Sequence, residues 1–258
     1  MGPRTALVSI VTPVLNAARF LPDLLASLRA QDYPHIEHIV VDGGSTDGSI
    51  EMIRAAAGVT LVTGHDRGMY DAINRGFEMA RGEYVGYQNA DDRYADGGAV
   101  TSMVDHFDGH PEADVVYADF RYIDVDGRAT ADAQAPEFTA DRLYRYNFVP
   151  AHSTLVRRRI LVEDGLRPDP DLRFTGDWDW FVRMARAGKR FSHLPRVVSE
   201  FREHACSISA TVGWRVKFSE WRRTCRRNAT SFPSLLWNEG LYRPLRRRLR
   251  PLRRRLGV

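Results

Sequence analysis

The chain has 258 residues, of which 43% are hydrophobic and 27% are charged, so it is expected to form a packed domain rather than a disordered chain. It contains no apolar run near the roughly 20 residues that a membrane-spanning helix needs, and no signal-peptide pattern. The formal charge of +4 is uneven, because residues 241–258 hold eight arginines and no acid, which leaves a net −4 on residues 1–240. Two cysteines without a metal-binding spacing favour a reducing compartment.

The first half alternates apolar β-branched runs with segments of helical periodicity. This alternation predicts an α/β fold in which a Rossmann-like, mainly parallel sheet is flanked by helices. The predicted strands cover residues 8–14, 36–41, 60–63, 84–88 and 114–117, and the predicted helices cover residues 20–31, 49–57 and 69–80.

The second half is less regular. Residues 121–140 indicate a hairpin or an excursion, and residues 152–156 and 197–201 indicate strands. A short helix is predicted over residues 177–187, and helical periodicity returns from residue 212 onward. The predicted organisation is a domain over residues 1–211, in two halves (1–118 and 119–211), followed by a helical, Arg-rich extension over 212–258.

Acidic residues follow two of the predicted strands. Asp42 ends the second strand, and Asn89, Asp91 and Asp92 follow the fourth. Ligands of parallel α/β sheets bind at the carboxyl ends of the strands, and hard cations such as Mg²⁺ and Mn²⁺ take oxygen ligands and bridge to phosphates. The pattern therefore suggests a nucleotide site in which one acid contacts the nucleoside and others hold a metal on the diphosphate.

Four segments together resemble the family 2 glycosyltransferases with the GT-A fold. They are Val8–Asn16, Val40–Gly48 (Val-Val-Asp-Gly-Gly-Ser-Thr-Asp-Gly), Asp66–Gly76 (Asp-Arg-Gly-Met-Tyr-Asp-Ala-Ile-Asn-Arg-Gly) and Asn89–Asp92. Their order and spacing match from about Ser9 to Ser209. The third segment is similar to that of bacterial enzymes that build extracellular polysaccharides and cell-surface glycolipids.

The resemblance implies a nucleotide-sugar-binding half over residues 1–118, which would hold the donor site, and an acceptor-binding half over residues 119–211. Thr12 and Pro13 would line the nucleobase pocket with Asn16, and Asp42 would accept a hydrogen bond from a base N–H. The remaining donor contacts would come from Asp66 and Arg67 beside the ribose and diphosphate, and from Asn89, Ala90 and Asp91.

The resemblance also implies a site for Mn²⁺ or Mg²⁺. Asp91 would ligate the metal, Asp92 would lie in its first or second shell, and His204 matches a position at which many relatives place a metal-binding histidine. Relatives usually carry an acid where this chain has Asn89, which accepts hydrogen bonds but brings no charge.

The candidate catalytic base is Asp177, which matches the second acid of a Glu-Asp pair in the family, with Gly176 in place of the Glu. An inverting transfer needs such a carboxylate to remove the proton of the acceptor hydroxyl. Asp179 is an alternative base, although its side chain points to a different side of the helix. His152, Trp178 and Trp180 are candidate acceptor contacts.

Each candidate also has a structural interpretation. Asp42 and Asp47 are common capping residues in a Gly-rich turn, and Asp177 fits an N-cap as well as a base. The two tryptophans fit core or lid positions, and His152 fits a structural histidine equally well. The Gly-rich turn lacks the Gly-Lys-Ser/Thr of a P-loop, so it does not indicate ATP hydrolysis.

The Arg-rich end repeats one heptapeptide, Arg-Pro-Leu-Arg-Arg-Arg-Leu, over residues 243–249 and 250–256. A basic segment with a leucine stripe fits peripheral contact with an anionic membrane, and a solvated arginine tail fits nearly as well. No nucleic-acid motif accompanies the charge, so no nucleic-acid partner is expected.

The favoured function is an inverting, metal-dependent transfer of a sugar from a nucleoside diphosphate (UDP, GDP or dTDP). The acceptor would be a hydroxyl of a glycan or lipid-linked molecule, used in cell-surface polysaccharide or glycolipid synthesis in the cytoplasm or at the inner face of the membrane. One alternative is a sugar nucleotidyltransferase, although residues 9–16 lack the Lys/Arg-containing, Gly-rich loop that holds a triphosphate. The other is a non-catalytic nucleotide-sugar-binding or membrane scaffold subunit, suggested by Asn89 and Gly176.

Overall fold

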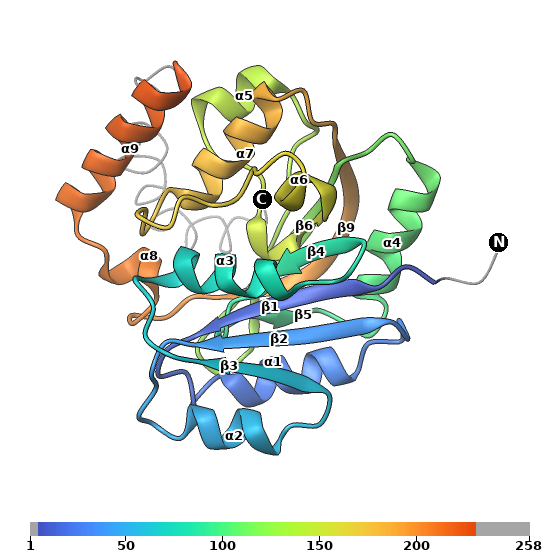
Figure 1. The fold of residues 1–258 in the computed structure, drawn as a ribbon, viewed down its shortest axis with the longest axis vertical. Helices are drawn as coiled ribbons and strands as arrows, with labels where there is room; N and C mark the ends of the chain where they lie inside the picture. The colour runs from blue at the N-terminus through green and yellow to red at the C-terminus, as the bar shows by residue number, and fades with distance from the viewer. Residues whose placement is uncertain (1–4, 231–258) are drawn as a thin grey trace, which may run out of the picture.

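The computed structural model describes residues 5–230, in which helices cover both faces of one mixed sheet (Figure 1). The strands are β1 (Val8–Val14), β2 (Ile36–Asp42), β3 (Val59–Thr63), β4 (Tyr84–Tyr87), β5 (Arg93–Tyr94), β6 (Val115–Ile123), β7 (Ala129–Ala133), β8 (Thr154–Arg157) and β9 (Phe191–Arg202). The helices are α1 (Leu21–Arg29), α2 (Ser49–Ala55), α3 (Met69–Met79), α4 (Ala99–Gly109), α5 (Ala140–Arg145), α6 (Arg159–Val162), α7 (Gly176–Arg186), α8 (Ile208–Thr211) and α9 (Trp214–Asn228), with a 3₁₀ turn η1 at Ala151–Ser153.

The strand order is β3-β2-β1-β4-β8-β6-β9-β5, with β7 paired to β6. The first four strands in this order are mutually parallel, as the sequence predicted. Val14 at the end of β1 lies opposite Asp42 at the end of β2, which in turn lies opposite Thr63 at the end of β3. The loops after these strands therefore meet at one edge of the sheet.

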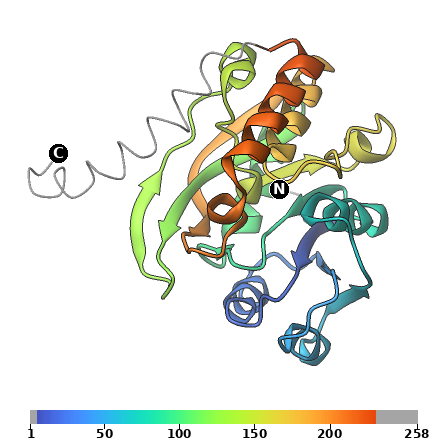
Figure 2. The same cartoon turned by 90° about the vertical axis from the view of Figure 1, so that its left-hand side faces the viewer.

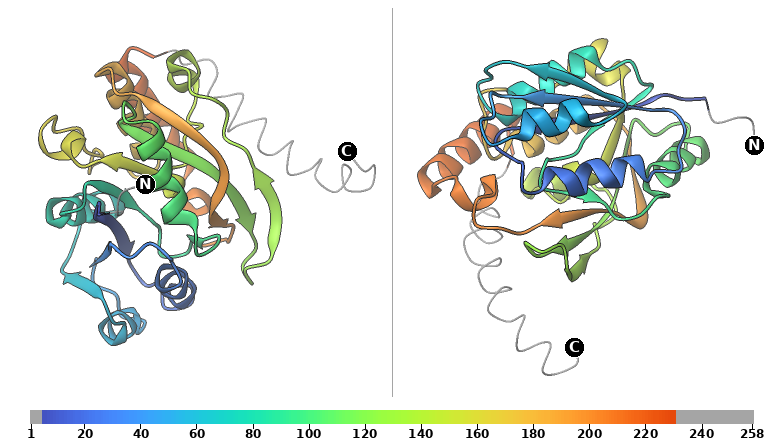
Figure 3. Two further views of the ribbon diagram at one scale, coloured as in Figure 1. Left: turned by 90° about the vertical axis from the view of Figure 1, so that its right-hand side faces the viewer. Right: turned by 90° about the horizontal axis from the view of Figure 1, so that it is seen from below.

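The other half of the sheet contains antiparallel pairs. β8 runs antiparallel to both of its neighbours, β4 and β6, whereas β6 and β9 are parallel. The less regular segment 121–140 contains the hairpin of β6 and β7, which lies at the outer side of the sheet (Figure 3). β6 continues through residues 118 and 119, the predicted boundary between the two halves of the domain.

Two apolar layers form because side chains alternate across the strands. Val8 and Ile10 of β1 pack with α1 and α4 on one face, while Val11 packs with α3 and α7 on the other. α3 lies unusually close to β1, since a Cβ atom at Gly76 would overlap the Val11 side chain. This close packing brings the start of α3 to the carboxyl edge of the sheet.

The sequence analysis missed α4, although its buried residues Ala99, Val100, Met103, Val104 and Phe107 have helical spacing. The preceding Gly97 and Gly98 and the polar residues around the helix give this segment the composition of a loop. The predicted strand at 152–156 is also corrected in part, because His152 lies in η1 and the strand begins at Thr154.

The predicted C-terminal helicity is confirmed for α9, which packs along α7 (Figure 2). Asn228 of α9 donates to the carboxylate of Asp179 in α7 over 2.8 Å. The arginine repeat at residues 243–256 lies outside the described residues. Within residues 5–230, no helix combines the length and the apolar character needed to cross a bilayer.

Candidate active site

Asp42 is completely buried at the end of β2, and its two carboxylate oxygens have different environments. Oδ1 accepts hydrogen bonds from the backbone N–H groups of Gly44 (2.9 Å) and Ser45 (2.8 Å). Oδ2 is also buried but has no hydrogen-bond partner among the described residues. Because buried polar atoms are normally paired, this oxygen is suited to an N–H donor supplied by a ligand.

The end of β1 lies beside Asp42 at the carboxyl edge of the sheet. The hydroxyl of Thr12 is buried against Nε2 of His38 at 2.9 Å, so the Thr12 side chain faces the interior. Burial lowers the pKa of His38 to about 4, which keeps this imidazole neutral. Pro13 lies in β1, paired with β2. Asn16 has φ of 52° and accepts a hydrogen bond from the Thr46 N–H, which joins the loops after β1 and β2.

Asp66 and Arg67 follow β3 at the same edge. Asp66 accepts a hydrogen bond from the Gly68 N–H at 2.9 Å, and its carboxylate lies where a Cβ atom of Gly43 would be. Gly43 therefore lets Asp66 approach the residue next to Asp42. The Arg67 side chain is 65% exposed and pairs with Asp71 at 2.8 Å, so it is accessible to an anionic ligand.

Asp91 and Asp92, which follow β4, have different environments. Asp91 Oδ2 lies 2.7 Å from Nε2 of His204, which confirms that residues from β4 and the end of β9 come together. Asp92 is buried, and its oxygens accept hydrogen bonds from the Arg202 backbone N–H (2.8 Å) and the Asn89 side chain (2.9 Å). Burial and the nearby charge of Asp91 raise the pKa of Asp92 well above its usual range. The expectation that Asp92 lies in the first or second shell of a metal stays a prediction.

Asp91 and His204 together fit a metal ion that also binds the phosphates of a substrate. Residues 5–230 hold no cluster of three or more Asp, Glu, His or Cys that would cage an ion. However, Mg²⁺ and similar ions commonly use one or two protein ligands and complete their shell with water and substrate phosphates. The carboxylate of Asp91 and the imidazole of His204 suit Mn²⁺ in such an arrangement. Asn89 Oδ1, buried without a partner among the described residues, lies in the same loop.

Asp177 lies in the first turn of α7. The N-cap of α7 is Thr175, so the interpretation of Asp177 as an N-cap is wrong. Asp177 Oδ1 accepts the Trp178 backbone N–H at 2.8 Å, and Asp177 Oδ2 accepts the side-chain amide of Asn147 at 2.9 Å. The charges of both Asp177 and Asp92 add to burial in raising the pKa of Tyr87, at the end of β4. The candidate base and the β4 loop therefore both act electrostatically on the same phenol.

Three other predicted site residues lie in the protein interior. Trp178 and Trp180 are 2% and 1% exposed, and their indole N–H groups donate to backbone carbonyls inside the protein. The expectation that they form a sugar platform is wrong, because their rings belong to the core. The alternative that Asp179 is the base is wrong, because Asp179 is fully buried and paired with Arg183 at 2.7 Å.

His152 has a structural environment. Its Nδ1 lies 2.7 Å from the Ser199 hydroxyl, and its ring packs between Phe120 and Phe201. Burial lowers the pKa of His152 to about 3, so the imidazole is neutral. An acceptor contact by His152 stays a prediction.

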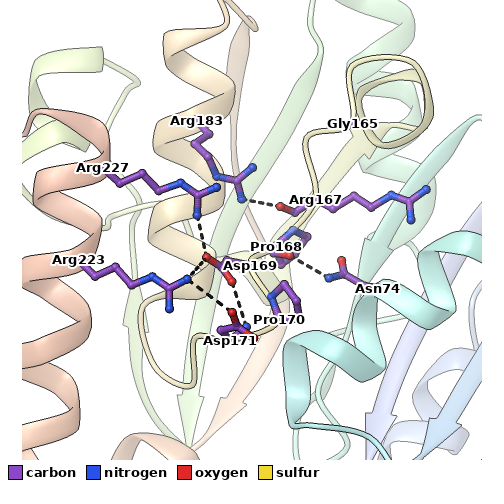
Figure 4. Close-up of a pocket in the computed structure, with 10 residues that line it drawn as sticks. All are labelled: Asn74, Gly165, Arg167, Pro168, Asp169, Pro170, Asp171, Arg183, Arg223 and Arg227. Carbon is purple, nitrogen blue, oxygen red and sulfur yellow. Dashed lines mark hydrogen bonds and ion pairs between the residues drawn. The ribbon is translucent and has the colours of Figure 1, made fainter.

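An open cavity of about 600 Å³ lies between α3, α7, α9 and the loop before α7 (Figure 4). Its lining residues are Asn74, Gly165, Arg167, Pro168, Asp169, Pro170, Asp171, Arg183, Arg223 and Arg227. Asp169 accepts hydrogen bonds from Arg223 (3.0 Å) and Arg227 (2.7 Å), so part of this polar surface is already paired. None of the predicted donor-site residues lines the cavity.

Sequence reasoning missed three residues that organise the site. Tyr70 contacts Asp177 from α3, Asn147 contacts it from the segment before η1, and Glu220 of α9 accepts the backbone N–H groups of Arg173, Phe174 and Thr175. Tyr70 belongs to one of the four motifs, but the motif alone assigns it no role. The other two lie in segments without a motif.

A family model for glycosyl transferase family 2 matches residues 9–163. The chain belongs to this family. It is therefore a glycosyltransferase, as the sequence predicted.

Relatives of this family 2 glycosyltransferase include enzymes of glycolipid and polysaccharide synthesis. The chain is 32% identical over 183 residues to the PGL/p-HBAD biosynthesis glycosyltransferase of Mycobacterium tuberculosis, with 68% of each chain covered. It is 31% identical to the O-antigen biosynthesis protein RfbC of Myxococcus xanthus, over 81% of this chain and 17% of that protein.

Solved structures share its fold. TarS of S. aureus in complex with UDP-GlcNAc superposes with a TM-score of 0.71 at 20% identity, covering 89% of this chain and 68% of that one. A mannosyltransferase of Pyrobaculum calidifontis in complex with GDP-Man and Mn²⁺ gives a TM-score of 0.65 at 20% identity, covering 87% and 65%. These similarities confirm the predicted GT-A fold of the family 2 glycosyltransferase.

Proposed function

We propose that this glycosyltransferase is inverting and metal-dependent. It moves a sugar from a nucleoside diphosphate to a hydroxyl of a glycan or lipid-linked acceptor. The observation that carries the proposal is the unpartnered, buried Oδ2 of Asp42 at the carboxyl edge of the parallel strands. A nucleobase N–H, such as N3–H of uracil or N1–H of guanine, would satisfy this oxygen.

The diphosphate would lie between the β3 and β4 loops. Asp66 and Arg67 approach from the first, and Asn89, Ala90 and Asp91 approach from the second. Solved structures of fold relatives contain UDP-GlcNAc in one case and GDP-Man with Mn²⁺ in another, which supports a nucleotide-sugar donor for this chain.

Asp91 and His204 would hold Mn²⁺ or Mg²⁺. The bound ion would supply positive charge to the leaving diphosphate. Asn89 adds no charge to this site, so the protein contributes a single carboxylate and an imidazole to the ion. The Arg202 side chain, 1% exposed, donates to the Asp91 carbonyl at 2.8 Å and thereby fixes the loop that carries the ligand.

Asp177 would act as the base. Its carboxylate would take the proton of the acceptor hydroxyl while the hydroxyl oxygen forms a bond to the anomeric carbon. The bond between that carbon and the diphosphate oxygen would break, and attack from the opposite side would invert the configuration. The role requires a carboxylate near the β4 loop, which agrees with the common influence of Asp177 and Asp92 on Tyr87.

The acceptor class is proposed from the relatives. One acts in PGL/p-HBAD biosynthesis and another is named for O-antigen biosynthesis, so an acceptor in a glycolipid or cell-surface polysaccharide pathway fits best. We propose that transfer takes place in the cytoplasm or at the inner face of the membrane.

Thermal-shift measurements with UDP, GDP, dTDP and CDP, each with and without Mn²⁺ or Mg²⁺, test the donor site. A ligand at 100 times its Kd raises the free energy of unfolding by about 2.7 kcal/mol, so a metal-dependent shift with one nucleotide is expected. Asp42→Asn should abolish it, because the amide replaces an acceptor with a donor.

The control for this measurement is Asp96→Asn, which makes the same charge change at an ion pair with Arg196. The control should keep the nucleotide-dependent shift. If the folded parent protein shows no shift with any nucleotide, the proposed donor site is wrong.

A further inference from the structure

Two polar side chains from distant parts of the chain meet at the carboxylate of Asp177. The hydroxyl of Tyr70, in the first turn of α3, lies 3.5 Å from Oδ1 and accepts the backbone N–H of Asp177 at 3.1 Å. The amide of Asn147, which follows α5, donates to Oδ2 at 2.9 Å. Each carboxylate oxygen therefore has a neutral donor beside it.

Tyr70 is held firmly in this position. Its side chain is 2% exposed, and its ring lies against Gly176, where a Cβ atom would overlap it. Burial and the charge of Asp177 raise the pKa of Tyr70 well above its usual range. The hydroxyl thus stays protonated and remains a hydrogen-bond donor at physiological pH.

We propose that Tyr70 and Asn147 are positioning residues that fix the rotamer of Asp177 and set its affinity for a proton. The proposal rests on the role of Asp177 as the base. A carboxylate at a helix start rotates about two side-chain bonds, and donors on both oxygens restrict that rotation. Orientation of a reacting group can contribute a large part of a rate enhancement.

The chemistry of the two donors also suits a base. Hydrogen bonds to the ionised form favour that form, so the carboxylate is ready to accept a proton. Because both donors are neutral, they stabilise the charge less than an Arg or Lys would, and they leave the carboxylate more basic. Oδ1 also accepts the Trp178 backbone N–H, so the acceptor hydroxyl would approach Oδ2, which has two lone pairs.

Other titratable groups lie around this cluster. Tyr87 of β4 and Glu220 of α9 both act electrostatically on Tyr70, and Asp92 acts on Tyr87. Tyr70 and Asn147 form hydrogen bonds with the Asp177 carboxylate itself. Substitution of these two residues is therefore the direct way to change the environment of the base.

The first test needs no substrate. Carbon-detected NMR of ¹³C-labelled protein follows the titration of the Asp177 carboxyl, assigned by its loss in Asp177→Asn. In Tyr70→Phe and Asn147→Ala the titration midpoint should move to higher pH, because each variant loses a donor to the ionised form. In Asn147→Asp it should move further, by more than about one pH unit, because a second carboxylate is placed beside the first.

The second test uses donor hydrolysis, with water as acceptor and UDP-GlcNAc or GDP-mannose as donor. The rate should fall about 10-fold in Tyr70→Phe, the acidic limb of the pH profile should move with the NMR midpoint, and the KM for the donor should stay unchanged. Tyr117→Phe is the matched control, because its hydroxyl donates to the Pro136 carbonyl away from Asp177.

The results separate the two proposals. If Asp177→Asn hydrolyses the donor normally, the base is elsewhere and the proposed mechanism is wrong. If Asp177→Asn is inactive but Tyr70→Phe and Asn147→Ala titrate like the parent protein, only the positioning proposal is overturned. If Asn147→Asp fails to fold, Asn147→Ala and Tyr70→Phe still test the positioning proposal. Asn147→Ala only shortens a side chain, and Tyr70→Phe keeps the buried ring.

Discussion

The ring of Tyr70 occupies the space that a side chain at position 176 would need. Gly176 stands where related enzymes often carry a glutamate, a departure that is compatible with a non-catalytic scaffold. The contact provides a different explanation, because a glycine at the start of α7 lets α3 approach and brings the Tyr70 hydroxyl to Asp177. The missing glutamate is therefore a packing feature of this chain.

The first prediction concerns this contact. Gly176→Ala should lower the free energy of unfolding by about 1–3 kcal/mol, because overpacking a dense core forces neighbours to shift. In a Tyr70→Leu background the cost should be smaller, since the ring is gone. Urea unfolding measures both. Gly109→Ala, at the end of α4 with open space around it, should cost little; equal losses for the two alanines would contradict the packing argument.

The second prediction separates the two neighbouring carboxylates. Asp177→Asn should reduce turnover by at least about 100-fold with nucleotide affinity unchanged, because general-base catalysis contributes factors of about 10²–10⁴. Asp179→Asn should chiefly reduce stability, because Asp179 is buried between Arg183 and Asn228. Rates of nucleoside diphosphate release and denaturation midpoints distinguish them. Loss of turnover in a stable Asp179→Asn, with an active Asp177→Asn, would reverse the assignment.

A third prediction follows from the buried histidines. His38 and His152 have pKa values of about 4 and about 3 in the folded protein, against 6.5 as the ordinary value. As the pH falls below 6.5 the unfolded state binds protons that the folded state excludes, so stability is lost. From about pH 7 to pH 5 each histidine should cost about 2 kcal/mol by this linkage.

The measurement is the pH dependence of urea unfolding in His38→Gln and His152→Asn, compared with the parent protein. Each variant should lose less stability between about pH 7 and pH 5. Each variant is compared with the parent protein, because the raised pKa of Asp92 affects all three proteins alike. It increases the free energy of unfolding as the pH falls, which opposes the loss caused by the histidines. Identical pH slopes would show that neither imidazole is held neutral.

The fourth prediction concerns the metal. Asp91→Asn and His204→Gln should each weaken Mn²⁺-dependent nucleotide binding by about 10-fold or more, because each would remove one of the two proposed ligands. Asp92→Asn keeps the shape and one acceptor oxygen, so it should affect the loop more than the metal. Calorimetric titration with and without Mn²⁺ measures the effect. A metal affinity that depends on Asp92 but not on His204 would overturn the proposed ligand pair.

The fifth prediction tests Glu220. Its buried carboxylate accepts three backbone N–H groups from the segment just before α7. Glu220→Ala should lower the free energy of unfolding by about 3 kcal/mol or more, since unpaired buried donors cost about 1–3 kcal/mol each. Glu220→Gln should cost less because it retains an acceptor oxygen. Glu51→Gln, on the exposed side of α2, is the control; equal effects for Glu51→Gln and Glu220→Gln would contradict this role.

The parallel half of the sheet, with strands β1 to β4, is largely predictable from the sequence. Parallel strands with β-branched runs have a clear pattern, and their carboxyl ends must share an edge, so the strand pattern alone puts Asp42 and Asp91 at the correct edge. The pairing of Asp91 with His204 depends on the family resemblance, because nothing local connects residues 113 positions apart.

The rest of the site depends on long-range packing. The sequence shows that Trp178 and Trp180 lie next to the candidate base, but not that α7 is enclosed by other elements, which buries both rings. Asn147 and Glu220 contact the base-bearing segment from regions without a motif. Single side chains that meet across the fold have no periodicity in the sequence, so these contacts are visible only in three dimensions.

The position of Glu220 bears on where the functional unit ends. The sequence pattern assigns residues 212–258 to an extension outside the catalytic domain, yet α9 provides the acceptor for the turn that presents Asp177. We infer that a fragment ending at residue 211 would leave that turn unsupported, whereas one ending after Asn228 would keep it. Changes on α9 can therefore alter turnover through the backbone segment that precedes Asp177.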